Sequence, residues 1–217
     1  TAHASHELRT PLSRITAKIE NTIIDDATST KGKTFLKSIL LDVNQLTELI
    51  NSLLVLSKID TKNQEHNDVQ RMDEIVFSAI ENLNNSFPDF VILFEMEESE
   101  NLDTALEVKG NKNLLEIAFS NILKNACVYS DNKQAKVKFS TENDHLVISI
   151  SNTGQTLSEN EQKNLFQPFM RGKNAKGTNG FGLGLRIVQR ILNLHNSSIT
   201  YSIPDINTNL FRIFFHS

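Results

Sequence analysis

Ser5-His6-Glu7-Leu8-Arg9-Thr10-Pro11-Leu12 is the stretch around which the rest of the chain is organised. It sets a histidine beside an apolar repeat of helical spacing, formed by residues 8, 12, 15, 19 and 23. His6 lies about 200° around the helix from Leu8, so it faces solvent, and Thr10, four residues on, shares its face. Pro11 removes a helical hydrogen bond at a cost of about 3 kcal/mol. We therefore expect the helix to bend or loosen beside the histidine.

A second helical repeat covers residues 33–59 and forms a heptad seam, made of Leu36, Ile39, Val43, Leu46, Ile50 and Leu53. The polar segment 25–32 separates the two repeats, which predicts an antiparallel helical hairpin. Such a hairpin cannot bury this much apolar surface alone. Pairing of two copies into a four-helix bundle predicts a homodimer through residues 1–60. The alternative is that the hairpin packs on the chain's own second domain.

The rest of the chain has a different pattern. Residues 61–71 are polar and predict a linker, and residues 72–217 mix helical and strand periodicity. The expected helices are 72–87, 112–129 and 182–195, and the expected strands are 91–96, 106–109, 136–140, 146–151, 199–203 and 210–215. The fold class is therefore α+β: a helical hairpin, then an α/β sandwich whose mixed sheet has helices on one face.

Composition limits the functional classes. The net charge of −4 gives no indication of a nucleic-acid partner, and a single cysteine, Cys127, excludes an intrachain disulfide. We find no apolar run that approaches the roughly 18–20 residues needed to span a membrane, and no signal peptide. We expect a cytoplasmic fragment whose membrane parts lie outside this sequence.

Four segments of the second domain suit a nucleotide. Asn121 and Asn125 lie one turn apart on the expected helix 112–129, and two aligned amides suit a magnesium ion that also binds phosphates. Asn152-Thr153-Gly154 ends a strand, where a polar side chain can reach a base edge. Two surface asparagines and a simple turn are the alternatives for these segments.

The other two segments lie further along the chain. Leu165–Arg171 contains Phe169 and Arg171, and it precedes a polar segment with Lys173 and Lys176, which we interpret as a lid over the phosphates. Core packing of the phenylalanines is compatible with that role. Gly180-Phe181-Gly182-Leu183-Gly184-Leu185 then opens a helix whose free amides favour phosphate. The spacing matches neither a Rossmann nor a Walker loop.

The octet at residues 5–12 resembles the phosphoacceptor box of bacterial sensor histidine kinases, and the four later segments resemble the asparagine, first glycine, phenylalanine and second glycine motifs of their ATP-binding domain. The resemblance covers nearly the whole chain. It implies that His6 is phosphorylated from ATP, that Glu7 assists it, and that Thr10 serves a phosphatase reaction. It implies a nucleotide site of Asn121, Lys124, Asn125, Tyr129, Asn152, Gly154, Phe169, Arg171, Lys173, Gly180, Gly182, Leu183, Gly184 and Leu185, with Mg²⁺ on Asn125.

The sequence departs from the family pattern at three positions. Asn152 replaces an aspartate, Thr156 replaces the second glycine of the first glycine motif, and Val128 replaces a lysine. The resemblance implies a kinase that passes its phosphoryl group to an aspartate of a response regulator, with a parent protein in the bacterial inner membrane. A phosphatase-dominated enzyme and a nucleotide-binding dimeric scaffold are the alternatives. Cis or trans phosphorylation stays open.

Overall fold

The computed structural model describes residues 2–24, 29–61, 68–175 and 180–216. The chain divides into two compact units, Thr1–Lys62 and Asn63–Ser217. Each unit is described by itself.

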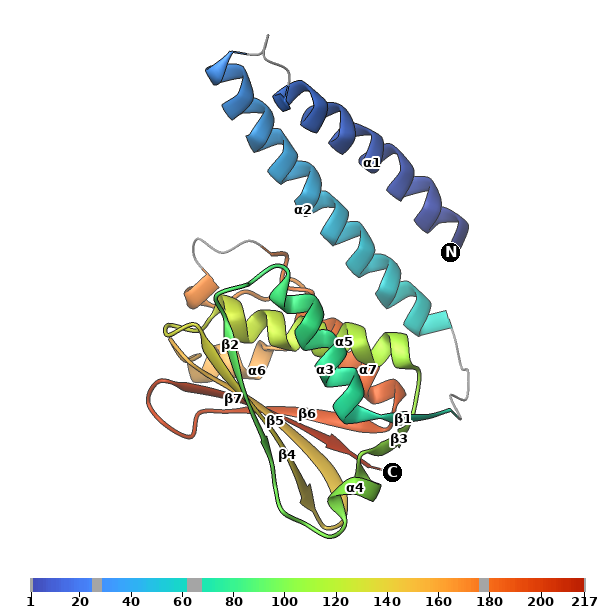
Figure 1. Ribbon diagram of the computed structural model, residues 1–217, viewed down its shortest axis with the longest axis vertical. Helices are drawn as coiled ribbons and strands as arrows, with labels where there is room; N and C mark the ends of the chain where they lie inside the picture. The colour runs from blue at the N-terminus through green and yellow to red at the C-terminus, as the bar shows by residue number, and fades with distance from the viewer. Residues whose placement is uncertain (1, 25–28, 62–67, 176–179, 217) are drawn as a thin grey trace. The chain divides into compact units, whose positions relative to one another are not determined.

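The first unit is an antiparallel pair of helices, α1 (Ala2–Ile24) and α2 (Thr30–Thr61), which run side by side in Figure 1. Helix α1 is continuous through Pro11, so the proline does not interrupt it. Ile19 and Val43 are buried between the helices. The larger set of apolar side chains is exposed: Ile15, Ile24, Phe35, Leu41, Leu46 and Leu53. The hairpin therefore has an apolar surface that its two helices do not cover.

The expectation that no segment of the sequence is long and apolar enough to span a membrane is wrong for helix α2. Among the described residues, Thr30–Ser57 is long and apolar enough to cross a membrane by length and composition, with a mean hydropathy of 1.4. Polar residues divide this stretch into short apolar runs, whereas a mean hydropathy tolerates polar residues within the helix. The same stretch contains Asp42 and Glu48, and an acidic side chain at a bilayer centre costs about 2.5–3.5 kcal/mol. Length and composition alone are therefore weak support for a membrane helix.

The second unit is built on a five-stranded mixed sheet of order β2-β4-β5-β7-β6. The edge strand β2 runs parallel to β4, and the other neighbours are antiparallel. Figure 1 shows the helices α3, α5 and α7 on one face of this sheet. The bounds are β2 Val91–Met96, β4 Gln134–Glu142, β5 His145–Thr153, β6 Ser197–Ser202, β7 Thr208–Phe215, α3 Met72–Asn84, α5 Lys112–Val128 and α7 Gly184–Leu194. The predicted α+β class, with helices on one face of a mixed sheet, is confirmed.

Alternation along the strands explains why one face is covered. In β4, Ala135, Val137 and Phe139 are buried beneath the helices, while Lys136 and Lys138 point to the other face and pair with acidic residues. Strands β5 and β7 alternate in the same way: Ile148, Ile150, Phe211 and Ile213 lie in the core, and Ser149, Ser151 and Arg212 lie on the other face together with Leu210 and Phe214. A single hydrophobic core therefore lies between the sheet and α3, α5 and α7.

Several short elements of the structure were not predicted from the sequence. Residues 69–71, which the sequence analysis placed in the linker, form strand β1 (Val69–Arg71), which pairs with β3 (Glu107–Lys109). Arg71 anchors this pair, because its guanidinium binds both Asp73 and Asp103. The others are α4 (Leu102–Ala105), α6 (Glu159–Asn164) and the 3-10 turn η1 (Lys173–Ala175). Elements of three to six residues are too short to show a period.

Candidate functional site

The two asparagines of α5 lie beside the start of α7. Asn111 caps α5 by accepting the Leu114 amide, and the buried apolar side of the helix leaves Asn121 and Asn125 half-buried on another side. Asn121 donates its amide to the Ile117 carbonyl, 2.8 Å away. A Cβ added to Gly184 would stand 3.0 Å from Asn121 Oδ1. The asparagine helix and the glycine-rich helix start thus approach each other at one point, which a larger residue at position 184 would crowd.

The end of β5 meets the end of α5. Asn152 is only 6% exposed, and its Nδ2 donates to the carbonyls of Tyr129, at 3.1 Å, and Thr153, at 3.3 Å. Tyr129 is the residue at which α5 ends. A Cβ on Gly154 would stand 2.1 Å from the Tyr129 carbonyl oxygen, a distance that no side chain tolerates. Glycine is therefore required at position 154 by the close approach of two backbone segments.

The departure from aspartate at position 152 has a physical explanation in this contact. A carboxylate has no proton to donate to the Tyr129 carbonyl, whereas the Asn152 amide does. With Nδ2 used in this way, the other end of the amide, Oδ1, is the acceptor that Asn152 can offer to a base amino group. The amide substitution thus keeps one oxygen acceptor and adds a bond to the end of α5.

We expect Asn152→Asp, which restores the aspartate of the family pattern, to destabilise the fold. It would set a carboxylate oxygen against the Tyr129 carbonyl and leave a buried acceptor unpaired, at a cost of about 1–3 kcal/mol. Chemical denaturation monitored by circular dichroism measures this loss. Asn132→Asp is the matched control, because Asn132 is exposed and uses only its oxygen, which accepts from Ser130 and Gln134. Equal unfolding free energies for both variants would contradict the Asn152–Tyr129 bond.

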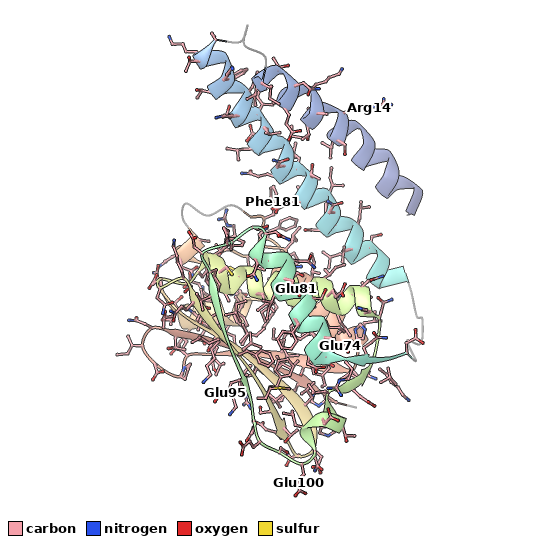
Figure 2. All side chains as sticks on the ribbon, viewed as in Figure 1. Arg14, Glu74, Glu81, Glu95, Glu100 and Phe181 are labelled. Atoms are coloured by element: carbon pink, nitrogen blue, oxygen red, sulfur yellow. The ribbon has the colours of Figure 1, made fainter. Side chains whose placement is uncertain are left out.

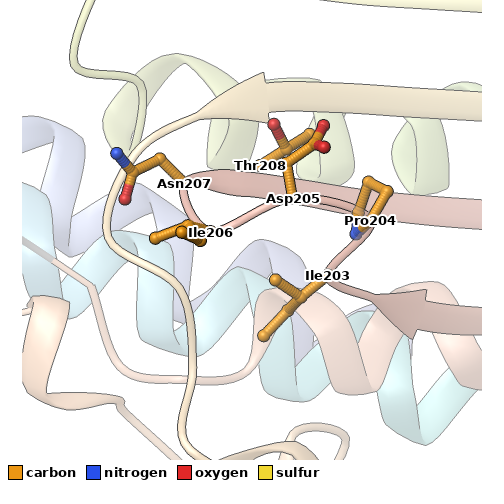
Figure 3. Close-up of a pocket in the computed structure, with 6 residues that line it drawn as sticks. All are labelled: Ile203, Pro204, Asp205, Ile206, Asn207 and Thr208. Atoms are coloured by element: carbon orange, nitrogen blue, oxygen red, sulfur yellow. The ribbon is translucent and has the colours of Figure 1, made fainter.

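Thr156, in place of the second glycine, ties the loop after β5 to the turn between β6 and β7. Its hydroxyl donates to the Ile206 carbonyl at 3.3 Å, and the Gly154 amide donates to the Asn207 carbonyl at 2.7 Å. That turn, Ile203–Thr208, lines an open hollow of 740 Å³ (Figure 3). All six lining residues come from the turn between β6 and β7, so the hollow is a surface feature of that turn. The predicted site residues lie elsewhere, on α5, at the end of β5 and around the glycine-rich helix start.

The phenylalanine segment packs against the second glycine motif through its backbone. Phe169 has a left-handed backbone, with φ of 63°, and its amide donates to the Gly182 carbonyl at 3.0 Å. Gly182 has φ of 70°, and a Cβ there would meet the Met170 carbonyl at 2.4 Å. The Phe169 side chain is 61% exposed, so the alternative that this ring packs in the core is wrong. Phe181, labelled in Figure 2, is half-buried.

Two of the cationic residues, Arg171 and Lys173, lie in residues 171–175, the described part of the segment that we interpret as a lid, here called the lid stem, and Lys124 lies on α5. Arg171 is exposed, and its guanidinium donates to the Ala175 carbonyl at 2.7 Å. Lys173 and Lys124 are exposed, and Lys176 lies outside the described residues. Leu183 is buried and precedes Gly184, the first residue of α7. Gly180 and Leu185 flank that helix start and are half-buried.

The three residues of the phosphoacceptor box all lie on α1. Helix α1 covers His6, Glu7 and Thr10. Their side chains lie outside the described residues, so the structure adds only that this stretch is helical.

The carboxylate of Glu161 attaches the stem of the lid, a role that the sequence analysis missed. Its Oε2 accepts the amide and hydroxyl of Ser158, which caps α6, and its Oε1 accepts the Lys173 amide at 2.7 Å. The Ser158 hydroxyl first, and then the Lys173 amide, lower the pKa of Glu161 to about 2. Ser158 and Glu161 have the spacing of a capping box, which is the signal that predicts α6.

We expect the lid attachment to weaken only in strong acid. The folded pKa of Glu161 is lower than its ordinary 4.5, so the attachment is complete above about pH 4.5 and is lost as the pH falls toward 2. An NMR titration of the Lys173 amide shift measures this, with an expected midpoint near 2. Glu161→Gln should remove the titration, and Glu159→Gln, on the same turn, should leave it unchanged. A midpoint near the ordinary pKa would contradict the proposed attachment.

A buried histidine joins the two helices that carry the site, although the sequence analysis assigned it no role. His195 Nε2 accepts the Asn111 amide at 3.0 Å, and its Nδ1 lies 2.7 Å from the Ile191 carbonyl. Those two partners fit the neutral ring with its proton on Nδ1. A Cβ on Gly110 would meet this ring at 2.6 Å. His195 thus fixes the start of α5 against the end of α7, and nothing in the local sequence pattern shows it.

Comparison with known proteins places both units in described families. Residues 1–62 match the His Kinase A (phospho-acceptor) domain, and residues 110–216 match the histidine kinase-, DNA gyrase B- and HSP90-like ATPase domain. The heme sensor protein HssS of Staphylococcus epidermidis is 28% identical over 98% of this chain and 46% of its own length. HssS of Staphylococcus aureus strain JH9 is 29% identical over 92% of this chain and 42% of its own length. The chain thus spans less than half the length of these relatives.

Solved structures share the fold. The Acinetobacter baumannii histidine kinase AdeS superposes with a TM-score of 0.64 at 20% identity, over 97% of this chain and 96% of its own. Full-length ShkA in complex with AMPPNP gives 0.73 at 17% identity, over 99% of this chain and 44% of its own. One chain thus carries a phosphoacceptor hairpin followed by an ATPase domain, in the order of the motifs found in its sequence. The protein belongs to the sensor histidine kinases of two-component systems.

Proposed function

We propose that this chain uses Mg-ATP to phosphorylate His6 and then passes the phosphoryl group to an aspartate of a response regulator. The observation that carries the proposal is the convergence of the nucleotide motifs in one unit. Asn121 meets Gly184, and Asn152 and Gly154 meet Tyr129, although these residues come from separate segments. The phosphoacceptor octet then supplies a nucleophile in the same chain.

The base and phosphates would use different parts of this site. Asn152 Oδ1 would accept from the adenine amino group, and Tyr129 lies beside it at the end of α5. The amides at the start of α7 would face the phosphates, because a helix N-terminus presents free donors and a partial positive charge. Lys173 and Arg171 lie on the lid stem with positive charge for the same groups.

Magnesium would be held mainly through the phosphates. Among the described residues there is no group of three or more His, Cys, Asp or Glu that suits a metal. Asn125 is half-buried one turn from Asn121 and offers an amide oxygen. Magnesium in nucleotide sites takes few protein oxygens and keeps waters, so this sparse donor set fits the ion. When bound, the ion would neutralise phosphate charge.

Phosphoryl transfer needs chiefly positioning and charge neutralisation. A ring nitrogen of His6 would form a bond to the γ-phosphorus while the bond to the β–γ bridging oxygen breaks and ADP leaves. Glu7 would hold the other ring proton. The phosphohistidine would then give its phosphoryl group to a carboxylate oxygen of the regulator, which restores His6.

The hairpin's uncovered apolar side chains favour pairing with a second copy through residues 1–60. Leu46 and Leu53 belong to the heptad seam and are 49% and 45% exposed. A second hairpin would cover the seam, and the acidic residues of α2 would remain in water, which a bilayer would not allow. A monomer in analytical ultracentrifugation would contradict this pairing. We place the chain in the cytoplasm, where ATP is available, and its parent protein in the bacterial inner membrane.

The test is incubation with γ-labelled ATP and Mg²⁺, followed by acid and base treatment of the labelled protein. A phosphohistidine loses its label in acid and keeps it in base. A phosphatase-dominated enzyme is the second candidate, favoured by Asn152, Val128 and the retained Thr10. It would show little label but would dephosphorylate a regulator. Calorimetry that detects no Mg-ADP binding would favour a dimeric scaffold that binds no nucleotide and would overturn the kinase proposal.

A further inference from the structure

A polar network lies behind the loop that follows Asn152, within the otherwise apolar covered face of the sheet. Asn209 of β7 is directly opposite Asn152 of β5 in the strand register, and it is 5% exposed. Tyr201 of β6 is half-buried, and its ring packs on Phe211 with centroids 5.1 Å apart. A buried amide and a half-buried hydroxyl at the end of a hydrophobic sheet are costly unless each is hydrogen-bonded.

Both side chains are bonded to the loop Gly154–Leu157. The Tyr201 hydroxyl donates to Asn209 Oδ1 at 2.6 Å and accepts the Leu157 amide at 3.3 Å. Asn209 Nδ2 donates to the Gly154 carbonyl at 3.4 Å. Burial raises the pKa of Tyr201 above its ordinary value, so the hydroxyl keeps its proton at neutral pH. The network therefore holds the first and last residues of the loop from behind.

The same loop connects the base-reading residue to the lid stem. Gly154 packs against Tyr129, and Leu157 is followed by the Ser158 cap whose partner Glu161 accepts the Lys173 amide. Asn174 of the lid stem donates to the Gln155 carbonyl at 3.3 Å. A displacement of the loop would therefore reach both the base site and the lid.

We propose that Tyr201 and Asn209 are positioning residues for nucleotide binding, which act by fixing the loop Gly154–Leu157 and touch no nucleotide themselves. This inference rests on the proposed ATP site. It assigns a role to strands β6 and β7, which carry none of the family motifs. Loss of the network would raise the KM for ATP more than it lowers kcat, because the loop shapes the binding site and the phosphoacceptor histidine lies on another element.

The test compares Tyr201→Phe with the native chain. The variant keeps the ring and its packing on Phe211 but loses both hydrogen bonds. We expect Mg-ADP affinity by calorimetry to fall about tenfold, equivalent to about 1.4 kcal/mol, with kcat changed less than twofold. Asn209→Asp should show a fall at least as large, because it replaces the donor to the Gly154 carbonyl with a buried carboxylate oxygen that opposes that carbonyl. Ser140→Ala is the control, since it deletes a buried hydroxyl bonded to Val147 near the other end of β5.

Hydrogen exchange of the Leu157 amide gives a readout that does not require nucleotide. We expect Tyr201→Phe to speed that exchange and Ser140→Ala to leave it unchanged. If the native chain binds Mg-ADP and Tyr201→Phe binds it equally well, the positioning role is overturned and the kinase proposal stands. If the native chain binds no adenine nucleotide, both proposals fall.

Discussion

His6→Gln is expected to reduce incorporation of label from γ-labelled ATP to the background of protein incubated without Mg²⁺. Glutamine has helix propensity similar to or better than that of histidine, so α1 should persist. Its amide nitrogen is not nucleophilic, so no phosphoramidate can form. The nucleotide motifs lie in the other compact unit, so Mg-ADP affinity by calorimetry should equal that of the native chain. The expected result is therefore a complete loss of phosphorylation with unchanged binding.

His145→Gln is the matched control for this variant. His145 is half-buried at the start of β5, and its ring lies 6.1 Å from that of His216. Its substitution should leave the label at the native level. Equal incorporation in the native chain and in His6→Gln would remove His6 from the mechanism, and label that withstands acid would point to another acceptor.

Gly154→Ala is expected to cost both nucleotide affinity and stability. The added methyl would meet the Tyr129 carbonyl oxygen at 2.1 Å, and the obstacle is backbone, which cannot rotate away. The end of β5 and the end of α5 would have to separate, which would break the bond from Asn152 to Tyr129. Overpacking of this kind costs about 1–3 kcal/mol of unfolding free energy. Mg-ADP affinity by calorimetry should fall about 10- to 100-fold, at a factor of ten per 1.4 kcal/mol.

Gly184→Ala separates this effect from a general loss of glycine. Its Cβ would meet only the flexible end of Asn121, at 3.0 Å, and alanine is a better helix residue than glycine by up to about 1 kcal/mol. We expect a midpoint of thermal unfolding equal to or above that of the native chain, with a smaller loss of affinity than in Gly154→Ala. Native stability and native affinity in Gly154→Ala would show that the two segments do not approach each other in solution.

Much of the fold was predictable because its signals are periodic and local. The repeats at residues 8–23 and 36–53 predicted the two hairpin helices, and the segments 91–96, 136–140, 146–151, 199–203 and 210–215 predicted the five strands of the sheet. The Asn111 cap is likewise a local feature, because its side chain accepts from an amide only three residues on. The short elements β1, α4 and η1 were missed, since three or four residues are too few to show a period, and β1 in addition needs a partner strand distant in sequence.

The candidate site, too, was predictable only in part. The glycine at 154 was predictable as a motif, but its reason, the Tyr129 carbonyl, comes from a helix more than twenty residues earlier in the chain. The same carbonyl explains why an amide suits position 152 here. His195, Tyr201 and Asn209 were missed altogether, because each acts through hydrogen bonds to backbone groups on other elements.

The sequence by itself determined the identity and order of the motifs: a histidine on an amphipathic helix, then paired asparagines and two glycine segments. Those depend on residue type and spacing along one element, which a linear pattern records. Only the tertiary structure decided which groups meet, that the Asn152 amide bonds the end of α5, and that β6 and β7 hold the loop beside it. Such contacts depend on the register of strands and the packing of helices, since they join backbone atoms that the sequence places far apart.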